Sequence, residues 1–313
     1  MTRKAVVIGV DHSSGNPLNS CILDAQEISK LLSKNADGSD NFEITELHDA
    51  TVNEALNAVQ ELFQSEADVA LFYFSGHGGL YQSVGSLQMT DGPLMLKGLM
   101  ESVLESNSQN RIVILDSCFS GDVGNILSNQ SLLVPGVTFM SACKRNEVSK
   151  CVKGRCSLYT SCIVDALSGG AADLFGDVSL DSIHSYADKI LSSGGQHPVF
   201  KTSANEFLSL RKAAPRISKD ELKEALLLFP NVDSQFQLDP SFEETNVDGS
   251  QDRHLKPYAI DENVRIFKKL QRLQGFGLVI PNDADYMYWA AMKSKSCSLT
   301  PIGQAYWRIF SNN

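Results

Sequence analysis

Residues 68–79 read DVALFYFSGHGG, and residues 111–122 read RIVILDSCFSGD. Each stretch opens with a short, almost wholly apolar run rich in β-branched and aromatic residues, which predicts a strand buried on both faces. Each run ends in small and polar residues, after Phe74 in the first stretch and after Leu115 in the second. In parallel sheets covered by helices, the chemistry lies beyond the carboxyl ends of the strands, so these two segments are the first candidates for a functional site.

Strand and helix patterns alternate through the rest of the first two thirds of the chain. Thr51 and Glu54, for example, form a capping-box pattern at the start of an amphipathic helical stretch. Continuous apolar strands that alternate with helices predict an α/β fold, with a mostly parallel sheet between two layers of helices. The predicted strands are residues 5–10, 42–47, 68–74, 111–115 and 137–141, and the predicted helices are residues 18–32, 51–63, 94–104, 158–167 and 180–191.

The chain has 313 residues, a length that favours two domains or one large domain with an appendage. We predict a domain of residues 1–215 and a second domain of residues 216–313, divided after Pro215. The second domain is expected to begin with a helix, followed by a polar stretch at residues 231–257 that is typical of a loop or insertion. Its later order of helix, short hairpin and helix is the outline of a winged-helix module.

The formal net charge is −10, and residues 1–215 carry −9 of it. A chain with this net negative charge lacks the overall positive charge that is typical of nucleic-acid-binding proteins. If the negative charges lie in a cleft, they would favour a cationic substrate. A basic stripe in the second domain keeps nucleic acid open as the less favoured partner, whereas its aromatic residues favour a protein partner. The stripe is Arg265, Lys268, Lys269, Arg272, Lys293 and Lys295, and the aromatic residues are Tyr286, Tyr288, Trp289, Tyr306 and Trp307.

Seven cysteines without a C-x-x-C pair argue against a zinc site, and in a cytosolic chain they are expected to be thiols. Cys118 is a candidate nucleophile, because Cys118 and His77 each follow one of the two buried strands. If those strands are neighbours, an imidazole base and a thiol meet at one edge of the sheet. The backbone amides of Gly78 and Cys118 would then be placed to form an oxyanion hole. Taken singly, a turn histidine and a buried thiol are the simpler interpretations.

Together, these motifs resemble the caspase-like cysteine proteases of the metacaspase and orthocaspase type, found among bacterial caspase family proteins. The resemblance covers residues 3–210 and implies the caspase-hemoglobinase fold, a three-layer sandwich with a mostly parallel sheet. It implies that His77 is the general base and Cys118 the nucleophile. The matching text is AVVIGVDH (5–12), LNSCILDAQEISKLL (18–32), DVALFYFSGHGG (68–79), RIVILDSCFSGD (111–122), VTFMSACKRNEVS (137–149) and QHPVF (196–200).

The resemblance also implies a substrate-binding pocket. True caspases carry their cysteine in a Q-A-C-x-G signature, whereas residues 116–121 read DSCFSG and place an anion, Asp116, two positions before the cysteine. The metacaspase pocket is acidic, and its matching residues here are Cys21, Asp24, Ser75 and Asp116. Two carboxylates that face one pocket would pair with a guanidinium or ammonium group, which implies cleavage after arginine or lysine. The alternatives are a surface helix carboxylate for Asp24 and a strand-end acceptor for Asp116.

Calcium binding and self-cleavage are left open by the sequence. Many metacaspases are activated by calcium, which binds to clustered aspartates. Five aspartates of this chain are candidates, but they cannot be mapped onto such a site residue by residue, and no metal ligand is assigned. Basic residues at 144–155 and at 211–216 are the candidate positions for self-cleavage. The candidate aspartates are Asp91, Asp122, Asp173, Asp177 and Asp181.

The sequence therefore predicts a cysteine endopeptidase that acts on protein substrates, with a regulatory protein partner at residues 216–313. The resemblance implies a role in a stress, cell-death or defence pathway. The alternative is a non-catalytic scaffold, or a nucleic-acid-binding regulator, whose caspase-like domain only binds. No apolar run approaches transmembrane length, and the N-terminus lacks a signal-peptide core, so we expect no membrane association and a cytoplasmic location.

Overall fold

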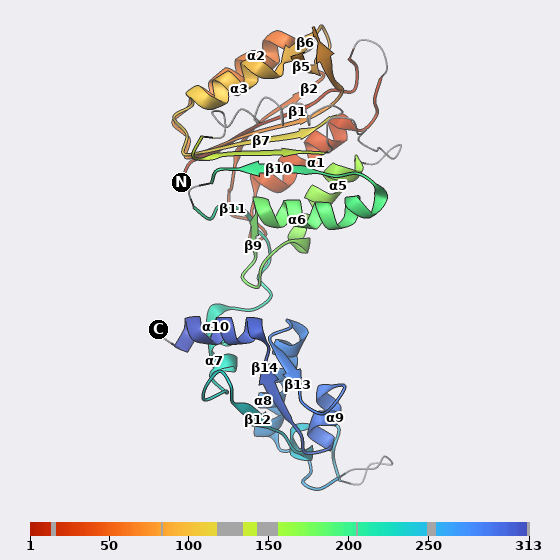
Figure 1. Ribbon diagram of the computed structural model, residues 1–313, viewed down its shortest axis with the longest axis vertical. Helices are drawn as coiled ribbons and strands as arrows, with labels where there is room; N and C mark the ends of the chain where they lie inside the picture. Colours follow the sequence, from red (N-terminus) through yellow and green to blue (C-terminus); the bar gives the residue numbers. More distant parts are fainter. Residues whose placement is uncertain are drawn as a thin grey trace. The chain divides into compact units, whose positions relative to one another are not determined.

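The computed structural model describes residues 1–13, 17–82, 84–117, 134–142, 156–204, 206–248 and 255–311 (Figure 1). The chain divides into two compact units, Met1–Pro215 and Arg216–Asn313. Each unit has its own sheets and helices and is described by itself. Within the described residues, no helix is both long enough and apolar enough to cross a membrane.

A six-stranded sheet forms the centre of the first unit, in the order β10-β8-β7-β3-β1-β2. All neighbouring strands are parallel except β10, which runs antiparallel to β8. The predicted α/β architecture with a mostly parallel sheet is therefore confirmed. The strands are β1 (Arg3–Gly9), β2 (Glu43–His48), β3 (Val69–Ser75), β7 (Asn110–Asp116), β8 (Val137–Ser141) and β10 (Val199–Thr202).

Helices cover both faces of this sheet, because successive side chains of a strand point to opposite faces. Val7 and Tyr73 pack on one face with α1, α5 and α6, whereas Val6 and Phe72 pack on the other face with α2 and α3 (Figure 1). Every residue of β3 and β7 is buried, so hydrophobic burial on both faces stabilises the centre of the sheet. The helices are α1 (Cys21–Ser33), α2 (Val52–Gln64), α3 (Leu96–Glu105), α5 (Leu158–Asp165) and α6 (Leu180–Leu191).

The carboxyl ends of the parallel strands lie level with one another. Gly9 of β1 is paired with Ser75 of β3, and Ser75 is paired with Asp116 of β7. In β8, Ser141 is paired with Leu115. This register places the residues that follow β1, β3 and β7 at one edge of the sheet, where the sequence predicts the site.

Two small antiparallel sheets of the first unit were not predicted. One directly follows His77 and contains β4 (Gly78–Tyr81), β5 (Val84–Gln88) and β6 (Pro93–Met95), and the other pairs β9 (Asp177–Ser179) with β11 (Ser209–Lys212). These strands have only three to five residues, and β4 begins with two glycines, so their sequences carry little strand signal. The short helices η3 (Ala166–Gly170) and η4 (Ser192–Gly194) extend α5 and α6.

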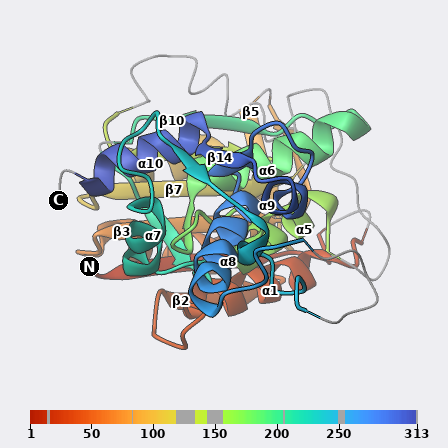
Figure 2. The same ribbon diagram turned by 90° about the horizontal axis from the view of Figure 1, so that it is seen from below.

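The second unit contains a three-stranded antiparallel sheet, in the order β12-β14-β13. Among its helices, α8 packs against α7, and α10 packs against α7 and β14 (Figure 2). The elements are α7 (Lys219–Leu226), β12 (Gln235–Gln237), η5 (Pro240–Phe242), α8 (Asp261–Gly275), β13 (Val279–Pro281), α9 (Met287–Met292), β14 (Ser296–Leu299) and α10 (Pro301–Ser311).

Two features of the second unit differ from the sequence prediction. β13 and β14 pair as expected, but α9 lies between them, so their connection is not a short hairpin turn. With six residues, MYWAAM, α9 is too short to show a helical period. β12 lies within the stretch that was predicted as a loop. The winged-helix module stays a prediction.

Gly9 allows α1 to lie against the end of β1, and its replacement tests that packing. A Cβ atom at Gly9 would press on the carbonyl oxygen of Cys21 and lie 2.8 Å from the Cα of Ile22. We expect Gly9→Ala to lower the free energy of unfolding by about 1–3 kcal/mol in urea denaturation, as overpacking does elsewhere. Gly98→Ala in α3 is the matched control, because its Cβ would meet nothing within 4 Å. Equal effects of the two variants would contradict this packing.

Candidate active site

Asp11 caps the start of α1 at the carboxyl edge of the sheet. Its Oδ1 atom accepts backbone N–H bonds from Ser20 at 3.0 Å and from Cys21 at 2.9 Å. A carboxylate at this position satisfies N–H groups of the first turn and interacts favourably with the helix dipole. Cys21 and Asp24 therefore lie in the first turn of α1, beside the end of β1 at Gly9.

Asp24 is completely buried, with 0% of its surface exposed. The Ser75 hydroxyl, at the end of β3, donates to Oδ2 of Asp24 at 2.6 Å, and the backbone N–H of Ser157 donates to Oδ1 at 2.9 Å. The thiol of Cys156 also forms a hydrogen bond with this carboxylate. The alternative of a surface helix carboxylate is therefore wrong for Asp24.

Asp116, the last residue of β7, is 4% exposed. Its Oδ2 atom accepts hydrogen bonds from the hydroxyls of Ser157 and Thr160, the latter at 2.7 Å. Ser157 is the N-cap of α5, and its hydroxyl also accepts the N–H of Thr160 at 2.9 Å. Ser157 thus contacts both carboxylates. We call the five residues Asp24, Ser75, Asp116, Ser157 and Thr160 the acid network.

The electrostatics of the acid network are dominated by burial. Burial raises the pKa of Asp24 to about 7, and the nearby charge of Asp116 contributes to the rise. The hydrogen bonds from Ser75, Ser157 and Cys156 act in the opposite direction and offset only part of it. Burial therefore holds the pKa of Asp24 well above the ordinary carboxyl range.

The cysteines that the structure describes are not reactive thiolates. Burial raises the pKa of Cys21, which lies beside Ser75 and Asp24, and that of Cys162. It also raises the pKa of Cys156 and Cys297 to about 12. A nucleophilic cysteine requires a lowered pKa, so none of these four has the character of a nucleophile. The other cysteines, Cys118, Cys143 and Cys151, lie outside the described residues.

His77 lies at the sheet edge directly after β3 and is half-buried. The backbone of this loop is tied to the neighbouring strand, because the N–H of Gly76 donates to the carbonyl of Asp116 at 3.2 Å. Gly78 begins β4 and is paired with Leu87 of β5. The structure therefore brings His77 and Gly78 to the edge that holds Asp116, whereas Cys118 lies outside the described residues.

Sequence reasoning missed Ser157 and Thr160. The only local signal was a serine directly before the predicted helix at residues 158–167, which is the pattern of an N-cap. That pattern predicts where a helix begins, but not that the capping side chain also contacts a carboxylate on another element. Ser157 and Asp24 are 133 positions apart, so their contact follows from the packing of α5 against α1.

The candidate calcium ligands that the structure describes have partners within the protein. Asp91 accepts the N–H of Val52 at 2.7 Å, and Asp173 accepts the N–H groups of Phe175 and Asp177. Asp177 pairs with Lys212, and Asp181 accepts the hydroxyl of Ser179. No group of three or more His, Cys, Asp or Glu side chains that could hold a metal ion occurs in the described part of the chain, and Asp122 lies outside it.

Comparison with known proteins gives one family and one fold. The family model described as "Caspase domain" matches residues 2–210. The fold is similar to the crystal structure of caspase-1 from Spodoptera frugiperda, with a TM-score of 0.51 and 16% sequence identity. The alignment covers 69% of this chain and 92% of that chain, and at this identity the likeness concerns the fold alone. No curated protein sequence matches the chain.

The ionisation of Asp24 can be measured directly. We expect its carboxyl carbon, followed by NMR in ¹³C-labelled protein, to titrate near pH 7, so that the group is protonated below that pH and ionised above it. Asp116→Asn should move the midpoint down, because it removes the neighbouring negative charge. Asp37 is the exposed control, since its hydrogen bonds from Ser39 hold its pKa below the usual value. A midpoint for Asp24 below about 5 would contradict the buried network.

Proposed function

The chain belongs to the caspase domain family, and on that premise we propose that it is a cysteine endopeptidase that cleaves proteins after arginine or lysine. The observation that carries the specificity is the acid network, in which Ser157 contacts two buried carboxylates, Asp24 and Asp116. Within the described part of the chain, no Lys or Arg side chain contacts Asp24. A guanidinium or ammonium group from a substrate would supply a counter-charge. Cys156, whose thiol forms a hydrogen bond with Asp24, is only half-buried, so the acid network approaches the protein surface at Cys156.

In the proposed reaction, the Cys118 thiolate attacks the carbonyl carbon of the scissile bond, and the bond to the leaving amine breaks as His77 donates a proton to that nitrogen. Water, deprotonated by His77, then hydrolyses the thioester. The backbone amides of Gly78 and Cys118 are the proposed oxyanion hole. The register supports this arrangement, because β3, which ends just before His77, pairs with β7, whose last residue Asp116 precedes Cys118 by two positions.

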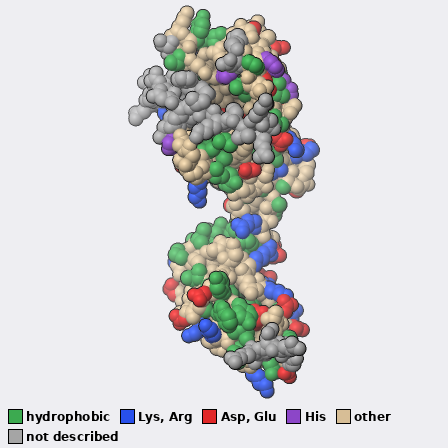
Figure 3. All heavy atoms as spheres, turned by 90° about the vertical axis from the view of Figure 1, so that its right-hand side faces the viewer, with side chains coloured by type: hydrophobic (Ala, Val, Ile, Leu, Met, Phe, Trp, Pro, Cys, Tyr) green, Lys and Arg blue, Asp and Glu red, His purple; other side chains and the backbone are tan. Residues whose placement is uncertain are grey.

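The second unit is proposed as the site of a regulatory protein partner. Of the fifteen large hydrophobic side chains that are exposed among the described residues, ten lie in Arg216–Asn313, although this unit is less than a third of the chain. Figure 3 shows hydrophobic side chains gathered on one face of this unit, with charged side chains around them. Exposed apolar surface with a polar border is typical of protein interaction sites. A role in a stress, cell-death or defence pathway is proposed from the family resemblance alone.

Cleavage of short peptides tests the specificity. We expect turnover of fluorogenic peptides that end in arginine or lysine, and none of peptides that end in aspartate. A peptide that ends in citrulline, the neutral isostere of arginine, should lose at least about 100-fold in kcat/KM, because its uncharged side chain cannot form an ion pair with the buried carboxylates. Asp116→Asn should cause a similar loss for the arginine peptide, whereas Asp37→Asn removes an exposed charge and should not.

Cys118→Ala is the control for catalysis and should abolish turnover of every peptide. Turnover by Cys118→Ala at the wild-type level would contradict the assignment of Cys118 as the nucleophile. Absence of turnover by the wild type, with and without calcium, would instead support the alternative of a non-catalytic scaffold or nucleic-acid-binding regulator. Preserved cleavage after arginine in Asp116→Asn would contradict the acidic pocket.

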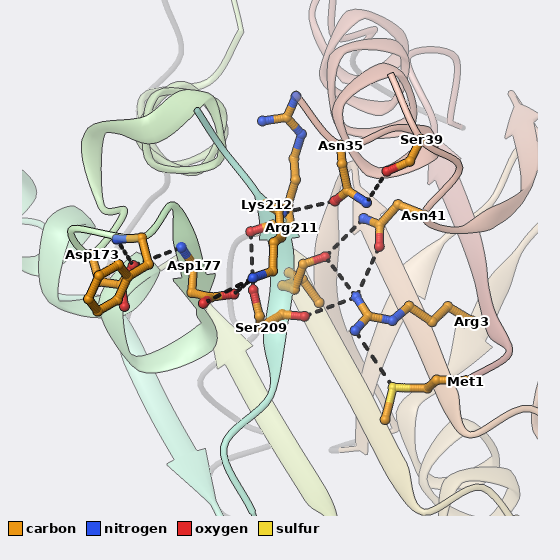
Figure 4. A network of polar contacts seen from close by, with 12 residues as sticks. Met1, Arg3, Asn35, Ser39, Asn41, Asp173, Asp177, Ser209, Arg211 and Lys212 are labelled. Carbon is orange, nitrogen blue, oxygen red and sulfur yellow. Dashed lines mark hydrogen bonds and ion pairs between the residues drawn. The ribbon is translucent and has the colours of Figure 1, made fainter. Parts of the chain in front are cut away.

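The residues at 211–216 differ in how accessible they are to self-cleavage. The Arg211 guanidinium donates to the carbonyl oxygens of Leu31, Lys34 and Leu167. Lys212 pairs with Asp177 (Figure 4). Both residues belong to β11, so their backbone is held in a sheet. Arg216 is exposed, with its guanidinium over the ring of Phe276 at 4.8 Å.

We therefore expect any self-cleavage in this stretch to follow Arg216 and not Arg211 or Lys212, because a scissile residue must leave its own contacts to enter the pocket. Intact mass spectrometry after incubation of the wild type and of Cys118→Ala would identify the cut. Arg216→Gln should remove it, and Lys219→Gln, three positions further along, is the matched control. A product that ends at Arg211 would contradict this expectation. The other candidate positions, residues 144–155, lie outside the described residues.

A further inference from the structure

We propose that Tyr73 and Thr160 are positioning residues that set how strongly Asp116 binds a basic substrate side chain. The inference rests on the proposed function, because it names residues that tune the same pocket. It goes beyond the pocket residues that the sequence resemblance implies, since neither Tyr73 nor Thr160 is among them. Its basis is a chain of hydrogen bonds whose direction follows from the donation of the Thr160 hydroxyl to Asp116.

The chain runs from the sheet to the carboxylate. The Thr160 hydroxyl donates to Oδ2 of Asp116 at 2.7 Å, and the Tyr73 hydroxyl lies 2.5 Å from the Thr160 hydroxyl oxygen. A hydroxyl has one hydrogen, and that of Thr160 is engaged with the carboxylate, so Tyr73 must be the donor to Thr160. Each dipole in the chain therefore points its positive end toward Asp116.

These groups are almost completely excluded from solvent. Tyr73 and Thr160 are both 0% exposed, and Asp116 is 4% exposed. The second donor to Oδ2, the Ser157 hydroxyl, is itself held by the N–H of Thr160. Thr160 therefore acts on Asp116 twice, once through its own hydroxyl and once by orienting Ser157. In such a low-dielectric setting, each oriented hydroxyl contributes more to an ionised carboxylate than it would in water.

Among the residues that the structure describes, one titratable group near Asp116 opposes its ionisation. The charge that does so is that of Asp24 on α1. Cys21 on α1, Tyr73 on β3 and Cys156 just before α5 also lie near Asp116, but their raised pKa values keep them uncharged. The two carboxylates repel each other, so the pair has a tendency to retain a proton. A retained proton competes with a substrate cation for the same oxygens. Hydrogen bonds that favour the ionised form shift this competition toward the cation, which is the role assigned to Thr160 and Tyr73.

Four variants test the inference with an arginine peptide between pH 5.5 and 8.5. Thr160→Val keeps the shape but removes the donor, and should raise KM about tenfold at pH 7 with kcat changed by less than about twofold. The pH dependence of KM should move upward by about one unit, because loss of a donor to the ionised form raises the carboxyl pKa. Tyr73→Phe should raise KM by about threefold. Thr160→Ser should restore the wild-type values, and Ser161→Ala, which removes a neighbouring hydroxyl that bonds the carbonyl of Cys156, should retain them.

Two outcomes would overturn the inference. One is a wild-type KM and pH profile in Thr160→Val. The other is a joint change in kcat and KM that Thr160→Ser does not correct, because that pattern indicates a packing defect. If the wild type cleaves neither arginine nor lysine peptides, the proposed function fails, and the carboxyl carbon of Asp116 is titrated by NMR in the same variants. A rise in its pKa in Thr160→Val then supports the inference, and an unchanged pKa overturns it.

Discussion

Ser157 donates its backbone N–H to Asp24 and its hydroxyl to Asp116, and the rest of the site depends on this double contact. The three residues come from α1, the end of β7 and the start of α5. A carboxylate cannot be kept ionised in a buried position without donors, since it would take up a proton or destabilise the fold. The first turns of the two helices and the end of the strand must therefore be placed together for either acid to be buried.

The donors compensate only part of the cost of burial. The pKa of Asp24 stays raised to about 7 despite hydrogen bonds from Ser75, Ser157 and Cys156. As the pH rises from the ordinary carboxyl pKa to about 7, the unfolded chain releases this proton before the folded state does, so the folded state loses stability, and the loss persists above pH 7. Residues that carry such a cost are common at functional sites. The same desolvation strengthens the attraction of the carboxylate to a cation. A group that destabilises the folded protein without substrate is therefore well suited to bind a basic side chain.

The sequence was sufficient for the parts of the fold and site that depend on local pattern. The apolar runs before Ser75 and Asp116 predicted two buried strands, and parallel pairing then placed both residues at one edge. The contact of Ser157 with Asp24 could not be predicted in this way, because it depends on how α5 packs against α1. β4 and α9 escaped prediction for a different reason, since strands and helices of four to six residues show no period.

The two helices of the acid network are also joined at their far ends. The guanidinium of Arg211 donates to the carbonyl oxygens of Leu31 and Lys34 at the end of α1, and to that of Leu167 in η3, which continues α5. A cation at the carboxyl ends of helices satisfies free carbonyl groups and interacts favourably with the dipoles. Asp11 caps α1 at its other end, so the helix that carries Asp24 is fixed by side chains from both ends of the first unit. Two helices held at both ends have little freedom to separate, and this restraint keeps the donors of Ser157 and Thr160 within hydrogen-bond distance of the two carboxylates.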